Sequence, residues 1–292
     1  SRPERVVSLS YQNHDNFLAL GVVPVGIRYW YGDYPFGVWP WAQEALGDAE
    51  PFVIEGEISI EAIAALEPDL IEAVWSGITE EEYQLLSEIA PVIPPAPQYD
   101  DYSMPWDEQA LAIGRMVGQA AEAQAQVDAI RARMADARAA HPAWEGASMA
   151  VAYFWQDAPG AYTAGDIRVT LLGQLGFVNA PALDAIAEPG AFYAQISSED
   201  LTPIDTDLLV WVVDDGSEAN ILAMPLRTQM RAHLEGREVY ADDLVSSAFS
   251  HASLLSLPYT LDVMLPLIEA AMDGDPATPV STSVAAGFAP AP

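Results

Sequence analysis

Two stretches of the chain repeat one pattern: ISIEAIAALEPDLI, from Ile58 to Ile71, and ISSEDLTPIDTDLL, from Ile196 to Leu209. They align without a gap, and Ile, Ser, Glu, Asp and Leu recur at matched positions. Three further apolar positions correspond, with Ile63, Leu66 and Ile71 of the first copy matched by Leu201, Ile204 and Leu209 of the second. The repeat predicts a short helical turn followed by a strand in each half of the chain.

Each copy carries a Glu two residues after a Ser, as Ser59 and Glu61 in the first and Ser197 and Glu199 in the second. Ser is a favoured N-cap residue, and a carboxylate in the first turn of a helix is stabilised by roughly 0.3–1 kcal/mol. This local effect accounts for either Glu alone. It does not account for the presence of Glu61 and Glu199 at matched positions in the two halves. A two-subunit partner with paired Arg residues would bind such a pair.

Around both copies, short apolar strands alternate with helical stretches. The strands are expected at residues 5–10, 22–27, 70–74, 92–93, 149–154, 208–213 and 238–240. Helices are expected at residues 80–89, 170–176, 225–234 and 253–272. This alternation is typical of the α/β class with a mainly parallel sheet.

Residues 106–140 differ from the runs on either side, because they contain no Pro and only Gly114 and Gly118. About 33 residues at roughly 1.5 Å each predict one helix on the order of 50 Å long. We expect residues 1–105 to form an N-terminal lobe, 106–141 a connecting helix and 142–275 a C-terminal lobe. Residues 276–292, rich in Pro, Ala, Ser and Thr, are predicted to be a flexible tail.

Composition excludes several classes of protein. The net charge is −32 and the eleven basic residues are all Arg, so the surface repels nucleic acid and we expect no nucleic-acid partner. There is no Cys, which excludes disulfides and thiolate metal sites, and no apolar run reaches the length of a membrane span. The chain begins at Ser1 without an apolar signal segment, so we expect a processed product.

Eight stretches of sequence match one protein family. They are RVVSLS from Arg5, LGVVPVGI from Leu20, YPFGVWPWAQEALGDAEP from Tyr34, ISIEAIAALEPDLI from Ile58, SGITEEEYQLLSEIAPVI from Ser76, PWDEQALAIGRMVG from Pro105, LLGQLGF from Leu171 and ISSEDL from Ile196. On these stretches the chain resembles the iron-complex family of ABC-transporter substrate-binding proteins, which take up siderophores, haem or cobalamin.

The resemblance implies a fold, a partner and a location. The fold would be α/β, with two Rossmann-like lobes joined by one long rigid helix and a ligand cleft between the lobes. One Glu of each lobe, here Glu61 and Glu199 by motif match, would dock on Arg residues of an ABC permease dimer. The protein would be an extracytoplasmic monomer, anchored as a lipoprotein or periplasmic.

In open α/β sheets, ligands bind outside the carboxyl ends of the strands. The loops expected at those ends are rich in aromatic residues, which suit a large, partly apolar ligand. Trp211 lies inside an apolar strand and is assigned to the core. In hydroxamate-binding members of the family a cleft aromatic precedes the second Glu segment and matches Tyr193. The predicted ligand-binding residues are Arg28, Trp30, Tyr31, Trp39, Trp41, Trp75, Tyr102, Trp155, Tyr162, Arg168, Tyr193 and Phe249.

Scarce cations favour one class of ligand. Only Arg28 and Arg168 fall in the loops expected at the cleft, and the Arg that some family members carry before the first Glu segment is absent from Phe52–Glu55. A ferric tricatecholate carries about three negative charges, whereas ferric hydroxamates are neutral or cationic. We therefore expect a ferric hydroxamate or a mixed-ligand siderophore, with iron held by the siderophore and no cofactor.

Other functions receive less support from the sequence. The four His residues, at positions 14, 141, 233 and 251, are scattered, and His233 is expected on a surface helix, so no direct metal site is predicted. His14, His251 or a Tyr could ligate haem, so a haem- or cobalamin-binding protein of the same transporter class remains the alternative. Asp214–Asp215 has no adjacent His and no catalytic motif is present, so we expect no enzyme.

Overall fold

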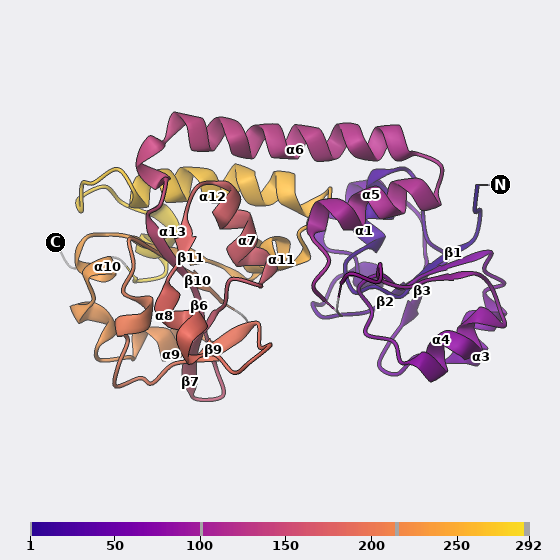
Figure 1. The fold of residues 1–292 in the computed structure, drawn as a ribbon, viewed down its shortest axis with the longest axis horizontal. Helices are drawn as coiled ribbons and strands as arrows, with labels where there is room; N and C mark the ends of the chain where they lie inside the picture. The colour runs from indigo at the N-terminus through magenta and orange to yellow at the C-terminus, as the bar shows by residue number, and fades with distance from the viewer. Residues whose placement is uncertain (1, 100–101, 214–215, 289–292) are drawn as a thin grey trace. The chain divides into compact units, whose positions relative to one another are not determined.

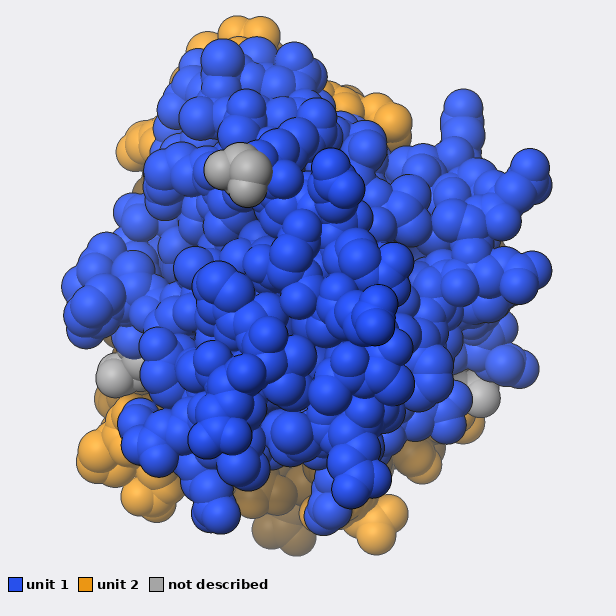
Figure 2. Space-filling view, turned by 90° about the vertical axis from the view of Figure 1, so that its right-hand side faces the viewer, with its two compact units in different colours: residues 1–131, 251–259 blue, residues 132–250, 260–292 orange. Residues whose placement is uncertain are grey.

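The computed structural model describes residues 2–99, 102–213 and 216–288, which leaves Asp214 and Asp215 outside the described residues. The chain divides into two compact units, coloured blue and orange in Figure 2. Unit 1 consists of Ser1–Arg131 and His251–Tyr259, and unit 2 of Ala132–Ser250 and Thr260–Pro292. Each unit contains a β-sheet covered by helices, so the predicted α/β class is confirmed (Figure 1).

The sheet of unit 1 has five strands in the order β3-β2-β1-β4-β5, and all four pairings are parallel. The first strand of the chain therefore lies at the centre of the sheet. The strands are β1 (Val6–Ser8), β2 (Gly26–Arg28), β3 (Phe52–Ile54), β4 (Leu70–Glu72) and β5 (Val92–Ile93). Because they are parallel, all five carboxyl ends meet at one edge.

Alternating side chains of these strands enter two different cores. Val7 and Ile71 pack with α3 and α4, whereas Val6 and Leu70 pack with α1 and α5. Two buried faces explain why the strands are almost wholly apolar. The helices of unit 1 are α1 (His14–Ala19), α2 (Pro40–Leu46), α3 (Ile60–Ala65), α4 (Glu80–Ser87) and α5 (Trp106–Met116), with the 3-10 helix η1 (Pro35–Gly37).

The predicted single helix over residues 106–140 is wrong in one respect, because the structure divides it into α5 and α6 (Ala120–Ala140). The break falls at Gly118, whose φ of 68° lies in the left-handed region that ends helices. Two Gln side chains then attach the following turns to the end of α1: Gln119 Nε2 donates to the Leu20 carbonyl at 2.6 Å, and Gln126 Nε2 to the Ala19 carbonyl at 3.2 Å.

The sheet of unit 2 is mixed. Its strands run in the order β11-β10-β6-β7-β9, with β8 pairing to β6, and β7 is antiparallel to both of its neighbours. The strands are β6 (Ser148–Trp155), β7 (Ala158–Tyr162), β8 (Val178–Asn179), β9 (Tyr193–Gln195), β10 (Leu208–Val212) and β11 (Glu238–Ala241). The β6–β7 hairpin distinguishes this sheet from the sheet of unit 1.

The helices that follow α6 are mostly short. They are α7 (Ile167–Gln174), α8 (Pro181–Ile186), α9 (Glu218–Leu222), α10 (Arg231–Leu234), α11 (Asp243–His251), α12 (Ser256–Ala271) and α13 (Ser281–Ala285), with the 3-10 helices η2 (Pro142–Trp144), η3 (Thr202–Ile204) and η4 (Arg227–Gln229). Among the described residues, no helix combines the length and apolarity that crossing a bilayer requires.

The predicted flexible tail is wrong for residues 280–288. They contain α13, and Phe288 is fully buried in the core of unit 2. The Phe288 carbonyl accepts a hydrogen bond from Arg227 Nη1 at 3.2 Å, and Ser283 Oγ donates to the Glu238 carbonyl at 2.7 Å. Burial of one aromatic ring and these two polar contacts order a segment whose composition alone predicts disorder.

The two copies of the repeat occupy equivalent places in the two sheets. The first leads into β4 beside β1, and the second into β10 beside β6, in each case parallel to the first strand of its unit. The matched apolar positions enter the two cores, with Ile63 and Leu66 in one and Leu201 and Ile204 in the other.

The copies differ in local structure, which corrects one prediction. Ser59 caps α3 by accepting a hydrogen bond from the Ala62 N–H at 3.2 Å, but Ser197 caps no helix. Its hydroxyl accepts from the Glu199 N–H within a turn closed between Ser197 and Asp200. Pro203 is the physical reason, because it has no N–H to donate to the Glu199 carbonyl and would break a helix that began at Ser197.

Candidate functional site

Four aromatic residues follow the carboxyl ends of four parallel strands in unit 1. Tyr11 follows β1, Trp30 follows β2, Trp75 follows β4 and Tyr102 follows β5. The ring centres of Tyr11 lie 5.6 Å from Trp30 and 6.4 Å from Tyr102, and Trp75 lies 5.8 Å from Tyr102. We call these four residues the unit 1 aromatic row. Trp30, Trp75 and Tyr102 were predicted, and the structure brings them together.

Arg28, at the end of β2, lies within this row. Its guanidinium carbon is 4.3 Å from the centre of the Tyr11 ring, and Nη1 donates to the Ser76 carbonyl at 2.8 Å. The Tyr102 hydroxyl donates to the same carbonyl at 3.3 Å. No Asp or Glu side chain among the described residues forms an ion pair with Arg28. The row therefore surrounds a cation that has no carboxylate partner within the described part of the chain.

Three other predicted residues pack beneath and beside the row. Trp39 is 1% exposed, so its ring supports the surface and is not part of it. Its ring is stacked on Trp41 at 5.1 Å and lies 5.2 Å from Tyr31. Trp41 also donates through Nε1 to Asp15 Oδ2 at 2.7 Å. Tyr31 and Trp41 keep partial exposure, whereas Trp39 is a core residue of the loop.

The loops that carry Tyr11 and Trp75 are joined by one buried carboxylate, Glu72. It accepts hydrogen bonds from Ser8 Oγ at 2.9 Å, Asn13 Nδ2 at 3.1 Å and the Val74 N–H at 2.9 Å, and also from Ser10 Oγ. Complete burial raises the pKa of Glu72, and the hydrogen bonds oppose that rise. Glu72 thus links the end of β1 to the end of β4 and sets the positions of both loops.

Residues 251–259 complete this side of unit 1 from far along the chain. Ser253 Oγ donates to Asp15 Oδ2 at 2.7 Å, and the Leu254 N–H donates to Asn16 Oδ1 at 2.9 Å. The His251 ring lies 5.1 Å from Trp30 and 5.0 Å from Trp41. The predicted C-terminal lobe, residues 142–275, is therefore interrupted by a segment that belongs with unit 1.

Unit 2 carries a second group of aromatic side chains, on a face of its sheet. Direct pairing places Tyr153 opposite Gly160 and Tyr162 opposite Tyr193, so these side chains share one face, with Trp155 two residues beyond Tyr153. The Tyr153 ring lies over Gly160, where a Cβ would come within 2.4 Å of it, and is 4.9 Å from Tyr162. We call Tyr153, Trp155, Tyr162 and Tyr193 the unit 2 aromatic face.

The Tyr153 hydroxyl of this face is a hydrogen-bond donor at neutral pH. Burial, and then the nearby Tyr162 and Tyr193, raise the pKa of Tyr153 above the usual value of a phenol. Trp155 and Tyr193 are 59% and 45% exposed, so the face presents both apolar rings and polar edges. Such a surface suits a large ligand with peripheral oxygens.

Arg168, the predicted cation of unit 2, is held against this face. Its guanidinium carbon lies 3.5 Å from the centre of the Tyr162 ring. Asp166 accepts from Nε at 2.8 Å and from Nη2 at 2.7 Å, and Ser250 Oγ accepts from Nη1 at 3.1 Å. Unlike Arg28, this cation has a carboxylate beside it that balances its charge.

Two other aromatic residues belong to the core. Phe249 was predicted in a loop as a ligand contact, but it lies in α11 and is 2% exposed, so this assignment is corrected. Apolar residues of α11 point inward and explain its burial. Trp211 is fully buried and donates to Glu238 Oε1 at 2.8 Å, so its assignment to the core is confirmed.

The His residues are less scattered than their positions suggest. His14 and His251 lie 6.5 Å apart in unit 1, and each is 1% exposed. Burial lowers the pKa of His14, although Asp15 opposes this. Neither His presents a nitrogen at the surface for haem iron. His233 was expected at the surface, but it is buried against Glu238 Oε2 at 2.7 Å. Within the described parts of the chain, no group of three or more His, Asp or Glu side chains could hold a metal ion.

Glu61 and Glu199 are both exposed, the first in the opening turn of α3 and the second in the turn before η3. Each follows the carboxyl end of a strand that lies at the edge of its sheet, β3 for Glu61 and β9 for Glu199. Their side chains are therefore accessible to a partner from each unit.

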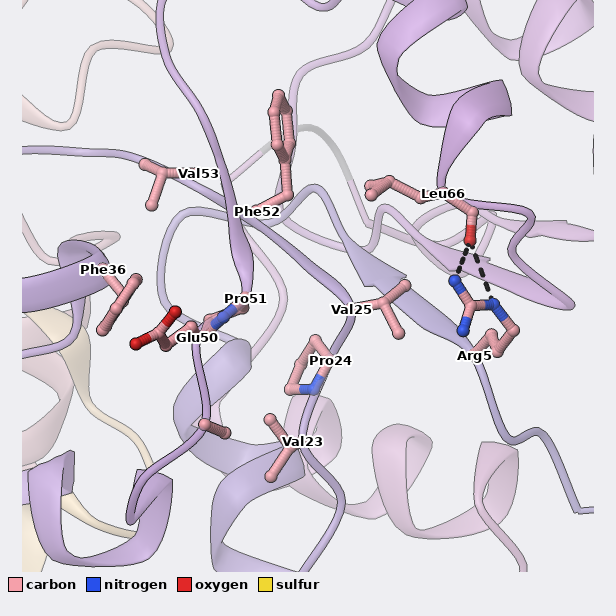
Figure 3. A pocket seen from close by; sticks show the side chains of 11 residues that line it. Arg5, Val23, Pro24, Val25, Phe36, Glu50, Pro51, Phe52, Val53 and Leu66 are labelled. Carbon is pink, nitrogen blue, oxygen red and sulfur yellow. Dashed lines mark hydrogen bonds between the residues drawn. The ribbon is translucent and has the colours of Figure 1, made fainter.

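Unit 1 also has an open hollow of about 640 Å³ at the other edge of its sheet (Figure 3). Its lining comes mainly from residues just before β1, β2 and β3 and from β3 itself, among them Arg5, Val23 and Phe52, and is completed by Phe36 and Leu66. Arg5 is turned away toward the Leu66 carbonyl, which accepts from Nε at 3.0 Å. The hollow lies at the amino ends of the parallel strands and shares no residue with the aromatic row.

Sequence reasoning missed Tyr11, Glu72 and Asp166, and it favoured the core for Tyr153. Tyr11 could have been found, because it follows the central strand just as Trp30 follows its neighbour. Glu72 carries a weaker signal, a carboxylate at the end of an apolar strand. The roles of Tyr153 and Asp166 depend on the β6–β7 hairpin, which was not predicted.

Known proteins resemble the chain over nearly its full length. The crystal structure of a periplasmic solute-binding protein from Mycobacterium smegmatis is 31% identical, with a TM-score of 0.82 over 93% of this chain and 94% of the other. The structure of PiaA from Streptococcus pneumoniae, an iron uptake ABC transporter substrate-binding protein, in complex with ferrichrome is 27% identical. Its TM-score is 0.75, over 94% of this chain and 95% of PiaA.

Similarity to curated proteins covers shorter stretches. The Fe(3+) dicitrate-binding periplasmic protein FecB from Escherichia coli is 33% identical over 136 residues, which are 46% of this chain and 43% of FecB. The chain matches less than half the length of its first curated relatives. The family pattern of periplasmic binding proteins, by contrast, matches residues 6–243, and the chain therefore belongs to the periplasmic binding protein family.

Proposed function

We propose that this protein captures a ferric siderophore outside the cytoplasm and delivers it to an ABC importer. The observation that carries the proposal is the unit 1 aromatic row around Arg28, at the carboxyl edge of a parallel sheet where α/β proteins bind ligands. Family membership and the similarity to PiaA support it. The unit 2 aromatic face would supply further ligand contacts.

The preferred ligand is a ferric hydroxamate or a mixed-ligand siderophore. With Arg168 balanced by Asp166, Arg28 is the one cation of the two predicted that has no carboxylate partner among the described residues. A ferric tricatecholate of about three negative charges would meet little compensation in a chain of net charge −32. The PiaA complex with ferrichrome, a hydroxamate, agrees with this preference, whereas FecB is named for a citrate complex.

A titration of intrinsic fluorescence tests the function, because Trp30, Trp75 and Trp155 lie in the proposed contact surfaces. Ferrioxamine B and ferrichrome are expected to quench the fluorescence saturably. Iron-free siderophore, ferric tricatecholate, haem and cobalamin serve as comparisons. Saturable binding of haem or cobalamin with no response to any ferric siderophore would contradict the proposal in favour of the alternative ligand.

Arg28→Gln provides a test at the site itself. The substitution removes the charge while keeping a long polar side chain, and we expect it to weaken binding of the ferric hydroxamate by about tenfold, as for a charged hydrogen bond. Arg115→Gln, on α5 and outside both aromatic groups, is the matched control and should bind as the wild type does. Equal affinity of the two variants would exclude Arg28 from the site.

Docking on the permease would use Glu61 and Glu199. Their exposure and their equivalent places in the two units support a partner with two equivalent basic sites. Replacing both by Ala should leave siderophore affinity unchanged and abolish uptake by cells that carry the cognate importer. Replacing Glu57 and Glu188, two other exposed residues, is the control. Normal uptake by the Glu61 and Glu199 variant would contradict the docking role.

The proposal also covers the location of the protein, its oligomeric state and the way in which it holds iron. The protein would act as a monomer, either lipid-anchored at the cell surface or in the periplasm. It would bind iron only through the siderophore, without a cofactor, and return its ligand chemically unchanged. Recovery of intact ferric siderophore after release, checked by mass spectrometry, separates this binding role from an enzymatic one.

A further inference from the structure

Inside unit 2, Arg168 forms an ion pair with the Asp166 carboxylate. Asp166 receives two parallel hydrogen bonds, from Nε at 2.8 Å and Nη2 at 2.7 Å. The two side chains are 14% and 6% exposed, so water screens the pair only weakly. Paired bonds of this geometry are among the strongest between charged side chains.

The local sequence builds this pair into the start of α7. Asp166 is the N-cap residue, and its Oδ1 also accepts the Arg168 N–H at 2.9 Å. The carboxylate and the guanidinium are therefore held two residues apart in one turn. Ser250 takes the third nitrogen, and Tyr162 covers one face of the guanidinium. The guanidinium is thus oriented as a flat, charge-compensated part of the unit 2 aromatic face.

Arg28 in unit 1 shows the contrast. It also lies against a tyrosine ring, Tyr11, but its Nη1 donates to the neutral Ser76 carbonyl. Each aromatic group thus contains one Arg, and among the described residues only the Arg of unit 2 has a carboxylate partner. The N-cap of α7 does not require a charged residue at position 166, because Asn or Ser would cap the helix equally well.

We propose that Asp166 determines the ligand charge that this protein selects, by neutralising Arg168 beside the unit 2 aromatic face. With the pair intact, the face accepts uncharged ferric hydroxamates and disfavours anionic iron complexes such as ferric citrate. Asp166 is a positioning residue that acts through Arg168. This inference rests on the proposed function, because it presumes that the face contacts an iron complex.

The test compares two ligands of different charge in one variant. Asp166→Asn keeps the size and the N-cap and removes one negative charge from beside Arg168. We expect the ratio of dissociation constants, ferric citrate to ferrichrome, to fall by about tenfold, because one partly shielded charge near an anion is worth at least that much. The gain for citrate should diminish as salt is raised, whereas ferrichrome binding should not respond.

Three further variants separate this role from a structural one. Asp166→Asn combined with Arg168→Gln restores neutrality and should return the ratio toward the wild-type value. Asp166→Glu keeps the charge and should preserve the preference. Asp136→Asn removes one exposed carboxylate of α6 and should change nothing.

The possible failures are distinct. If the wild type binds no ferric siderophore, the proposed function itself fails. If the wild type binds ferrichrome but Asp166→Asn leaves the ratio unchanged while remaining folded by circular dichroism, the role of Asp166 is overturned and the function stands. A fall in affinity for both ligands alike, unaffected by salt, would also overturn it.

Discussion

Single residues set the positions of the aromatic groups in both units. In unit 1, Glu72 accepts hydrogen bonds from both loops that carry Tyr11 and Trp75. In unit 2, Gly160 leaves room for the Tyr153 ring to lie across the sheet. The Ser10–Glu72 contact joins residues that are 62 positions apart, and the Tyr153–Gly160 contact requires the β6–β7 hairpin, which has little sequence signal.

Glu72 gives a prediction at this scale. Glu72→Ala would leave the Val74 N–H and the Asn13 amide buried without an acceptor, and should lower the free energy of unfolding by roughly 2–4 kcal/mol. Ligand affinity should also fall, because the Tyr11 and Trp75 loops lose their common partner. Urea unfolding and the fluorescence titration measure the two effects. Unchanged affinity in the folded variant would show that the loops do not depend on Glu72.

The pKa of Glu72 adds a dependence on pH. Burial raises this pKa above its unfolded value of 4.5, so the folded state binds the proton more tightly. The contribution of Glu72 to stability is then greatest at low pH and is lost as pH rises from about 4.5 through the raised pKa. Glu72→Gln does not titrate. The free energy of unfolding of Glu72→Gln, relative to that of the wild type, should therefore increase with pH over this range. A difference between the two free energies in urea unfolding that stays constant with pH would contradict this prediction.

At the scale of elements, the sequence predicts the buried strands more accurately than the turns. Residues 92–93 and 208–213 were predicted as strands and form β5 and β10. The β6–β7 hairpin was missed because its two-residue turn is Gln156–Asp157, with φ of 48° and 68°. Positive φ at both central positions normally selects Asn-Gly or Asp-Gly, so Gln-Asp gives almost no hairpin signal. Trp155, Tyr162 and Tyr193 were predicted as ligand contacts, but their shared face with Tyr153 depends on this hairpin and was not predicted.

Two glycines test how helix positions depend on backbone conformation. Gly118 separates α5 from α6 and has a φ of 68°, whereas Gly173 lies inside α7. At both positions, an added Cβ would have no other atom within 4 Å. Gly118→Ala should destabilise the protein by about 1 kcal/mol, because Ala is strained at positive φ. Gly173→Ala should stabilise it by about 0.5–1 kcal/mol through helix propensity. The midpoint of thermal unfolding should fall for Gly118→Ala and rise for Gly173→Ala. Equal shifts of the two midpoints would contradict this explanation.

At the scale of the molecule, both units depend on chain segments that are distant in sequence. The sequence pattern predicted the α/β class and two compact parts, because the repeated segment and the strands extend over both halves of the chain. It could not predict that residues 280–288 complete unit 2. The Pro- and Ala-rich tail has one large apolar residue, Phe288, and its burial depends on a cavity formed by other elements.

The tail supplies a prediction at the scale of the molecule. Phe288→Ala should lower the stability of unit 2 by roughly 3–5 kcal/mol, because it removes a fully buried ring that packs against Tyr240 and Arg227. Val284→Ala, in the same helical segment but half exposed, should change stability by less than about 0.5 kcal/mol. Urea unfolding followed by circular dichroism compares the two, and equal effects would show that the tail contributes no specific packing.

Residues 251–259 have a consequence for how the protein is made. Ser253 and Leu254 bond to Asp15 and Asn16, near the start of the chain, yet they are synthesised after nearly all of unit 2. At about 5–20 residues per second, a ribosome takes on the order of 10 s to pass from the end of the first segment of unit 1 to the second. The first segment of unit 1 therefore leaves the ribosome first. Unit 1 can finish folding only after residues 251–259 have been synthesised and have contacted Asp15, Asn16 and the loop that carries Trp41.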